Sequence, residues 1–155
     1  MTEIRKIEAT DVEHCVAVLR ALPQWFGIES AILDYGKDLE NLDGWVALDG
    51  SKLIGFIGLK RYGDAAVEIN VVGVLPDYRG KGIGTMLVGR VEAELGAGVR
   101  LLHMKTLAPS HPDPNYAETR AFWQARGFVP MDAHELWGEE NPCLVMVKPL
   151  GVIQA

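Results

Sequence analysis

Apolar residues recur with the three-to-four-residue spacing of an amphipathic helix in four segments of the chain. The clearest is 83–95, where Ile83, Leu87, Val91 and Leu95 form one stripe and glycines follow at once. The other predicted helices are 10–22, with Thr10 or Asp11 as N-cap, 29–42, with Ile32, Leu33, Leu39 and Leu42 inward, and 116–126, which Gly127 ends.

Runs rich in β-branched and aromatic residues predict strands between these helices. Residues 44–75 hold three such runs, separated by Asp49-Gly50 and by Tyr62-Gly63-Asp64, which is typical of an antiparallel meander. Further strands are predicted at 3–9, 99–108, 128–131, 134–137 and 142–150. This mixture of helices and strands predicts one α/β domain over residues 1–155.

Composition narrows the class of protein. The chain has 155 residues, 48% of them hydrophobic, and a formal net charge of -6, which favours a soluble protein over one that binds nucleic acid or an anionic membrane. No signal peptide and no membrane-length apolar run is visible, so a cytoplasmic setting is expected. Cys15 and Cys143 lie far apart, without metal-ligand spacing to any histidine, so no metal site is expected. On the first helix, His14 is expected at the surface and Cys15 in the core.

The segment PDYRGKGIGTML, residues 76–87, is the strongest chemical signal. A glycine loop between a strand and a helix predicts an anion site, because free backbone N–H groups and the helix dipole both favour negative charge. A dinucleotide loop requires a third glycine where Thr85 stands, and a P-loop requires a glycine where Leu75 stands. The spacing that fits is [RQ]-x-x-G-x-[GA], over residues 79–84.

Together with the segment RAFWQARGF, residues 120–128, this loop resembles the GNAT acyltransferase superfamily, and the order of elements agrees over residues 3–150. The resemblance implies a mixed, mostly antiparallel sheet of six to seven strands with about four helices, and acetyl-CoA as co-substrate. It implies coenzyme contacts at Val72, Val74, Arg79, Gly80, Lys81, Gly82, Ile83, Gly84, Thr85, Tyr116 and Trp123.

The implied reaction is acetyl transfer to a primary amine of a small molecule, peptide or protein, directly within a ternary complex. Glu68 is the expected general base, because it is the one acid between Asp64 and Asp77 and lies in an apolar strand. By resemblance, the N–H of Val72 polarises the acetyl carbonyl. Asn70 shares a strand face with Glu68 and could orient water or the acceptor, or simply fill space.

One departure supports a different function. Many superfamily members carry, at the position of Trp123, a tyrosine that protonates the leaving thiolate, and an indole cannot replace that acid. A non-catalytic acyl-CoA sensor or interaction module is therefore the alternative hypothesis, and water or Tyr116 could otherwise supply the proton.

The acceptor side carries weaker signals. Trp25, Phe26 and Trp137 could line an apolar wall, and Glu29, Glu135, Glu139 and Glu140 could attract an amine. A polyamine, an aminoglycoside, an amino acid and a protein amine all remain open. The apolar segment 143–150 could pair two copies as a homodimer, although burial within one chain explains it equally well.

Overall fold

The computed structural model describes residues 1–138 and 140–151. Over these residues the hydrogen-bonded strand order is β1-β2-β3-β4-β5-β7-β6, a seven-stranded, mostly antiparallel sheet, which confirms the predicted fold class. The chain groups into two compact units. The first comprises Met1–Lys60 and Ile69–Leu95, and the second comprises Arg61–Glu68 and the chain from Gly96 onward. The single domain over residues 1–155 stays a prediction.

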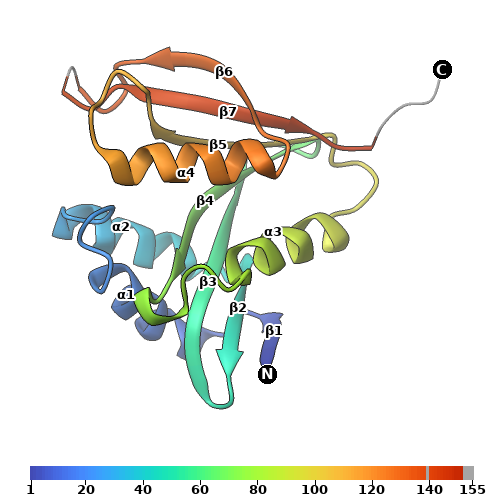
Figure 1. Ribbon diagram of the computed structural model, residues 1–155. Helices are drawn as coiled ribbons and strands as arrows, with labels where there is room; N and C mark the ends of the chain where they lie inside the picture. The colour runs from blue at the N-terminus through green and yellow to red at the C-terminus, as the bar shows by residue number, and fades with distance from the viewer. Residues whose placement is uncertain (139, 152–155) are drawn as a thin grey trace. The chain divides into compact units, whose positions relative to one another are not determined.

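The first unit contains most of the meander and three helices. Its helices α1 and α2 cover one face of the strands, and α3 covers the other face (Figure 1). Its elements are β1 (Thr2–Lys6), the 3-10 turn η1 (Ala9–Asp11), α1 (Val12–Arg20), α2 (Glu29–Leu39), β2 (Gly44–Asp49), most of β3 (Lys52–Arg61), the second part of β4 (Ala66–Val74), the 3-10 turn η2 (Pro76–Tyr78) and α3 (Ile83–Glu94).

Strand alternation explains how these helices divide between two faces. Val46, Leu48 and Phe56 point to the side of α1 and α2, where they join the main buried cluster. Gly55, next to Phe56, faces the other way, where an added Cβ would lie 3.4 Å from Ile83 of α3. The α3 stripe predicted from its spacing is confirmed, since Ile83 and two further stripe residues are buried.

The first helix confirms the predicted placements of His14 and Cys15 and the position of its N-cap. The His14 side chain is 63% exposed, whereas Cys15 is fully buried and burial raises the pKa of its thiol to about 12. Asp11 is the N-cap of α1, one of the two predicted positions, but its side chain makes no capping hydrogen bond to this helix. The Asp11 carboxylate instead accepts the Glu8 N–H at 2.8 Å and a bidentate pair of bonds from Arg5 at 2.7 and 3.0 Å. The Arg5 guanidinium lowers the pKa of Asp11.

Helix α2 is shorter than its hydrophobic pattern predicts, and the face that it buries differs from the predicted one. Ile32 and Leu39 are buried as predicted, but Leu33 is 55% exposed, so its inward placement is wrong. Gly36 has a packing reason that the sequence does not reveal: a Cβ there would lie 2.8 Å from Cγ2 of Val16 in α1. The close approach of the two helices thus depends on this glycine.

The second unit is built on β5 (Leu101–Leu107), α4 (Pro114–Ala125), β6 (Val129–His134) and β7 (Cys143–Pro149). β7 lies between β5 and β6 and is antiparallel to both, and Leu101 to His103 pair in parallel with Ala66 to Glu68 of β4. The separate strand predicted at 134–137 is wrong. β6 runs to His134, which pairs with Cys143, and the chain must then turn to enter β7.

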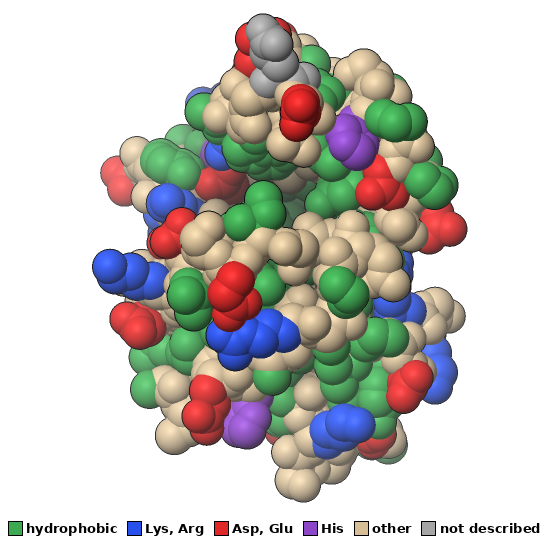
Figure 2. Space-filling model, turned by 90° about the vertical axis from the view of Figure 1, so that its left-hand side faces the viewer, with side chains coloured by type: hydrophobic (Ala, Val, Ile, Leu, Met, Phe, Trp, Pro, Cys, Tyr) green, Lys and Arg blue, Asp and Glu red, His purple; other side chains and the backbone are tan. Residues whose placement is uncertain are grey.

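No helix within the described part of the chain is both long and apolar enough to cross a membrane. The face drawn in Figure 2 shows acidic and basic side chains interspersed with hydrophobic ones, with no field of a single sign. Any anion site on this face must therefore depend on local geometry, because a broad basic surface is not present there.

Candidate active site

The glycine loop between η2 and α3 has the backbone conformation that only glycine adopts readily. Gly80 and Gly82 have φ of 76° and 82°, in the left-handed region. A Cβ at either position would meet no atom within 4 Å. Backbone conformation, and not crowding, therefore requires these glycines, and the space beside them is open to a ligand.

The loop leads directly into the N-terminus of α3. Gly82 is the N-cap and supplies no side chain, and the first helical bond runs from Met86 N–H to Gly82 O at 3.0 Å. The first turn of α3, which starts at Ile83, therefore begins with N–H groups that the helix itself cannot satisfy. Together with the positive end of the helix dipole, these groups form a site suited to phosphate.

Two basic side chains border the loop, and each lies on an aromatic ring. The guanidinium of Arg79 lies 4.1 Å from the ring centroid of Trp25, and the ammonium of Lys81 lies 5.3 Å from that of Tyr78. Tyr78 is fixed in turn by its hydroxyl, which donates to Asp49 at 2.9 Å. Arg79 of the predicted coenzyme loop thus packs on the ring of Trp25, a residue predicted to line the acceptor site.

These features fit the diphosphate of coenzyme A. Ile83 is 4% exposed, so its side chain belongs to the core and only its N–H can reach a ligand. Gly80 and Gly82 leave the backbone open, and Arg79 and Lys81 supply positive charge next to it. The loop offers backbone donors and cations without a competing carboxylate in its own sequence.

The predicted base, Glu68, lies in the second unit and is buried, with 4% of its surface exposed. Its Oε1 accepts the Tyr62 hydroxyl at 2.9 Å, and its Oε2 accepts the ammonium of Lys105 on β5. The Lys105 side chain is 27% exposed. We call Tyr62, Glu68, His103 and Lys105 the carboxylate cluster.

His103 completes this cluster because it pairs with Glu68 across the parallel β4–β5 ladder. Its ring lies 6.0 Å from that of Tyr62, centroid to centroid. Burial lowers the pKa of His103, so the imidazole is neutral at physiological pH. Cys143 on β7 is fully buried, and burial raises the pKa of its thiol. The cluster thus joins one carboxylate and one ammonium with neutral groups.

Other predicted site residues have partners of their own. Asn70 donates to Asp38 of α2 at 3.0 Å, so its side chain is tied to the first unit. Phe26 meets Tyr35 edge-on at 5.9 Å, and Glu29 binds Arg20 at 2.6 Å. Glu29 is therefore already neutralised by an arginine, and Glu139 lies outside the described residues.

The remaining residues predicted to contact the coenzyme lie at the C-terminal end of β4 and on α4. Val72 and Val74 are half-buried and alternate with buried residues along β4. Trp123 is 2% exposed and meets Phe122 and Phe128 edge-on, each at 5.1 Å. The indole is thus an internal packing residue of the second unit. Tyr116 is half-buried in the first turn of α4.

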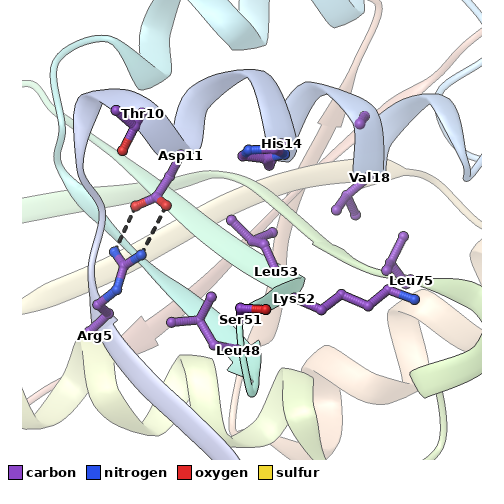
Figure 3. A pocket seen from close by; sticks show the side chains of 11 residues that line it. Arg5, Thr10, Asp11, His14, Val18, Leu48, Ser51, Lys52, Leu53 and Leu75 are labelled. Atoms are coloured by element: carbon purple, nitrogen blue, oxygen red, sulfur yellow. Dashed lines mark hydrogen bonds and ion pairs between the residues drawn. The ribbon is translucent and has the colours of Figure 1, made fainter.

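A cavity of about 480 Å³ opens in the first unit between α1 and the β2–β3 turn (Figure 3). Val18, Leu53 and Leu75 give it an apolar wall, and the Arg5–Asp11 ion pair borders it on one side. The acid and base of this pair already satisfy one another, and none of the predicted site residues lines the cavity. His14, Ser51 and Lys52 also line it, but no residue of the glycine loop or of the carboxylate cluster does.

Sequence reasoning missed Tyr62, His103 and Lys105. Two of them lie at alternate positions on β5 and so share a strand face, a pattern visible in the sequence. Their contact with Glu68, however, depends on the parallel register of β4 and β5, which no local pattern specifies.

Comparisons with known proteins agree with this geometry. Residues 40–130, more than half of the chain, match the family described as acetyltransferase (GNAT) domain. Over 40 residues the chain is 50% identical to mycothiol acetyltransferase of Corynebacterium efficiens, a stretch covering 26% of this chain and only 14% of that protein.

Two solved structures show the same fold at low sequence identity. The ribosomal-protein-S18-alanine N-acetyltransferase from Escherichia coli is 18% identical with a TM-score of 0.79, over 99% of this chain and 97% of that one. An aminoglycoside 6′-N-acetyltransferase complexed with coenzyme A is 19% identical with a TM-score of 0.78, over 99% of both chains. The family match and the shared fold agree with the glycine loop that opens α3. The chain therefore belongs to the GNAT family of N-acetyltransferases.

Proposed function

We propose that this chain transfers the acetyl group of acetyl-CoA directly to a primary amine within a ternary complex. The observation that carries the proposal is the open glycine loop at the N-terminus of α3, with left-handed Gly80 and Gly82 and no capping side chain on the helix. Such a loop suits the diphosphate of a coenzyme, and the family supplies the acetyl donor.

Backbone groups of the chain would hold most of the coenzyme. N–H groups from Arg79 to Gly84 would bind the diphosphate, with Lys81 beside them, and Thr85 would complete the first helical turn. Val72 and Val74 would pair through their backbone with the pantetheine arm, as an added strand pairs with a sheet edge. When bound, acetyl-CoA supplies a thioester, and the N–H of Val72 would stabilise the charge that develops on its carbonyl oxygen.

Glu68 would act as the general base. An amine with a reference pKa near 10.4 is charged at neutral pH and must lose a proton before it can attack. A buried carboxylate is a suitable acceptor for that proton, directly or through water. No cysteine lies in β4, so direct transfer is preferred to a covalent acyl-enzyme.

The acceptor is a primary amine whose identity the chain leaves open. The names of the two structural neighbours refer to an alanine of a ribosomal protein and to the 6′-amine of an aminoglycoside. An alanine-initiated peptide and an aminoglycoside with a free 6′-amine are therefore the first members of an acceptor panel, followed by polyamines and free amino acids.

The decisive experiment measures thiol release from acetyl-CoA with each amine, for the wild type and for Glu68→Gln. If Glu68 is the base, the variant should lose about 10²- to 10⁴-fold in kcat, the usual contribution of a general base. Its dissociation constant for acetyl-CoA, measured by calorimetry, should stay within about twofold. Glu118→Gln on the exposed side of α4 is the matched control and should behave as the wild type.

Two results would contradict the proposal in different parts. A Glu68→Gln variant with undiminished kcat would remove Glu68 as the base. Tight binding of acetyl-CoA by the wild type, with no thiol release from any amine, would overturn direct transfer to amines and support a binding role.

A further inference from the structure

We propose that Lys105 is a positioning residue for Glu68: its ammonium balances the buried charge of the carboxylate and holds it in one orientation, so that removing this ammonium should raise the pH that the reaction requires. The inference rests on the proposed role of Glu68 as base. It concerns contacts within the second unit only, where all members of the carboxylate cluster lie.

Both oxygens of Glu68 have a designated partner. Oε2 accepts the Lys105 ammonium, and Oε1 accepts the neutral Tyr62 hydroxyl at 2.9 Å. A hydrogen bond from an ammonium is roughly twice as strong as one from a neutral hydroxyl. Oε1 is therefore the oxygen from which a partner is more easily displaced, and we assign it as the proton-accepting atom.

The groups that face this carboxylate come from several elements, and one of them is a cation at neutral pH. Tyr62 comes from the β3–β4 turn, and His103 and Lys105 come from β5. His103 is neutral because burial lowers its pKa, and the Cys143 thiol on β7 is neutral because burial raises its pKa. Among the residues described around Glu68, Lys105 thus supplies the balancing charge.

Removing this charge has a defined consequence. A carboxyl group with 4% exposure and no neighbouring cation is more easily protonated, because burial penalises the charged form. Activity that requires the carboxylate would then be lost at a higher pH. An arginine would keep the charge, and a methionine would keep most of the volume without it.

The test compares Lys105→Met and Lys105→Arg with the wild type. The first readout is the acidic limb of the pH profile of kcat/KM, with acetyl-CoA and the best amine of the acceptor panel. For Lys105→Met the limb should move to higher pH by about one unit or more, the usual effect of losing an adjacent opposite charge. For Lys105→Arg it should stay within a few tenths of a unit of the wild type.

The second readout needs no acceptor. The thermal unfolding midpoint of Lys105→Met should fall below that of the wild type progressively as pH rises from about 4 to 8, because the unpaired carboxylate becomes charged in that range. Adding Glu68→Gln to Lys105→Met should abolish this pH-dependent difference. Lys105→Gln, which keeps a neutral donor, replaces the methionine variant if that variant does not fold.

The outcomes separate this inference from the proposed function. Parallel unfolding profiles for Lys105→Met and the wild type would overturn the inference whether or not an amine is acetylated. An acidic limb that shifts equally in Lys105→Arg and Lys105→Met would also overturn it. A wild type that acetylates no amine would contradict the proposed function, and the unfolding profiles would still decide the role of Lys105.

Discussion

Placing a carboxylate at Gly82 tests the loop more directly than any other single change. Gly82 has a φ of 82° and caps α3, and a Cβ there would meet no atom within 4 Å. Gly82→Asp is therefore compatible with folding. Its conformational cost is about 1 to 2 kcal/mol, because a left-handed backbone is unfavourable for an L-residue and aspartate tolerates it better than most.

The expected loss of coenzyme affinity has a separate, electrostatic cause. Two unit charges about 4 Å apart repel by about 1 kcal/mol in water and by about 4 kcal/mol near a protein surface. The open loop lies between these limits, so each diphosphate charge near the new carboxylate weakens binding by about 1 to 4 kcal/mol. Since 1.4 kcal/mol is a factor of ten, the dissociation constant should rise at least about fivefold and up to about a thousandfold.

Calorimetric titration with acetyl-CoA measures this loss, and two variants isolate its cause. Gly82→Ala introduces at least as much backbone strain without charge and should bind acetyl-CoA more tightly than Gly82→Asp does. Gly138→Asp adds the same charge at a left-handed glycine, φ 91°, in the turn between β6 and β7, and should bind as the wild type. The defect of Gly82→Asp should shrink in 1 M salt, where the Debye length is about 3 Å. Wild-type affinity for Gly82→Asp at low salt would refute the assignment of the loop as the diphosphate site.

Three further substitutions test the packing and electrostatics of the first unit. Asp11→Asn should lower the free energy of unfolding, measured in urea at pH 7, by about 1 to 3 kcal/mol. The Arg5 guanidinium lowers the pKa of Asp11, so this difference in stability should vanish as pH falls from about 4 through the folded-state pKa. Gly36→Ala should destabilise the fold by about 1 to 3 kcal/mol despite the better helix propensity of alanine, because its Cβ would lie 2.8 Å from a methyl group of α1. An unchanged midpoint of urea unfolding would contradict this packing. Trp25→Leu removes the ring whose centroid lies 4.1 Å from the Arg79 guanidinium and should weaken acetyl-CoA binding, measured by calorimetry, about two- to fivefold. A change only in the KM for the amine would instead indicate that Trp25 contacts the acceptor.

The coenzyme loop could be predicted because its information is local. Three glycines at alternate positions, a preceding strand and the stripe of α3 lie within one short stretch of sequence, and spacing alone excludes the competing phosphate loops. Gly80 and Gly82 have left-handed φ angles, a conformation that glycine adopts without steric cost. The four helices and most of the strands are predictable for the same reason, since hydrophobic period is a property of neighbouring residues, although the strand predicted at 134–137 is wrong.

The environment of the base could not be predicted in the same way. Lys105 reaches Glu68 from another strand, and nothing near either residue specifies the parallel register that brings them together. Leu33 illustrates the same limit on a helix: its spacing fits the apolar stripe, but the close crossing of α1 and α2 at Gly36 determines which face is buried. Local pattern identifies the elements, and non-local packing determines which side chains meet.

The tryptophan at position 123 is best understood through the chemistry of the leaving group. Trp123 is 2% exposed and packs against Phe128, so this position maintains the interior of the second unit and offers no exchangeable acid. A thiol with a reference pKa near 8.5 lies only about 1.5 units above neutral pH, so departure as a thiolate costs about 2 kcal/mol at that pH. The acceptor ammonium has a reference pKa near 10.4, so its deprotonation at neutral pH costs more than about 4 kcal/mol by the same measure. The larger demand therefore falls on the base, whose buried charge Lys105 is proposed to balance.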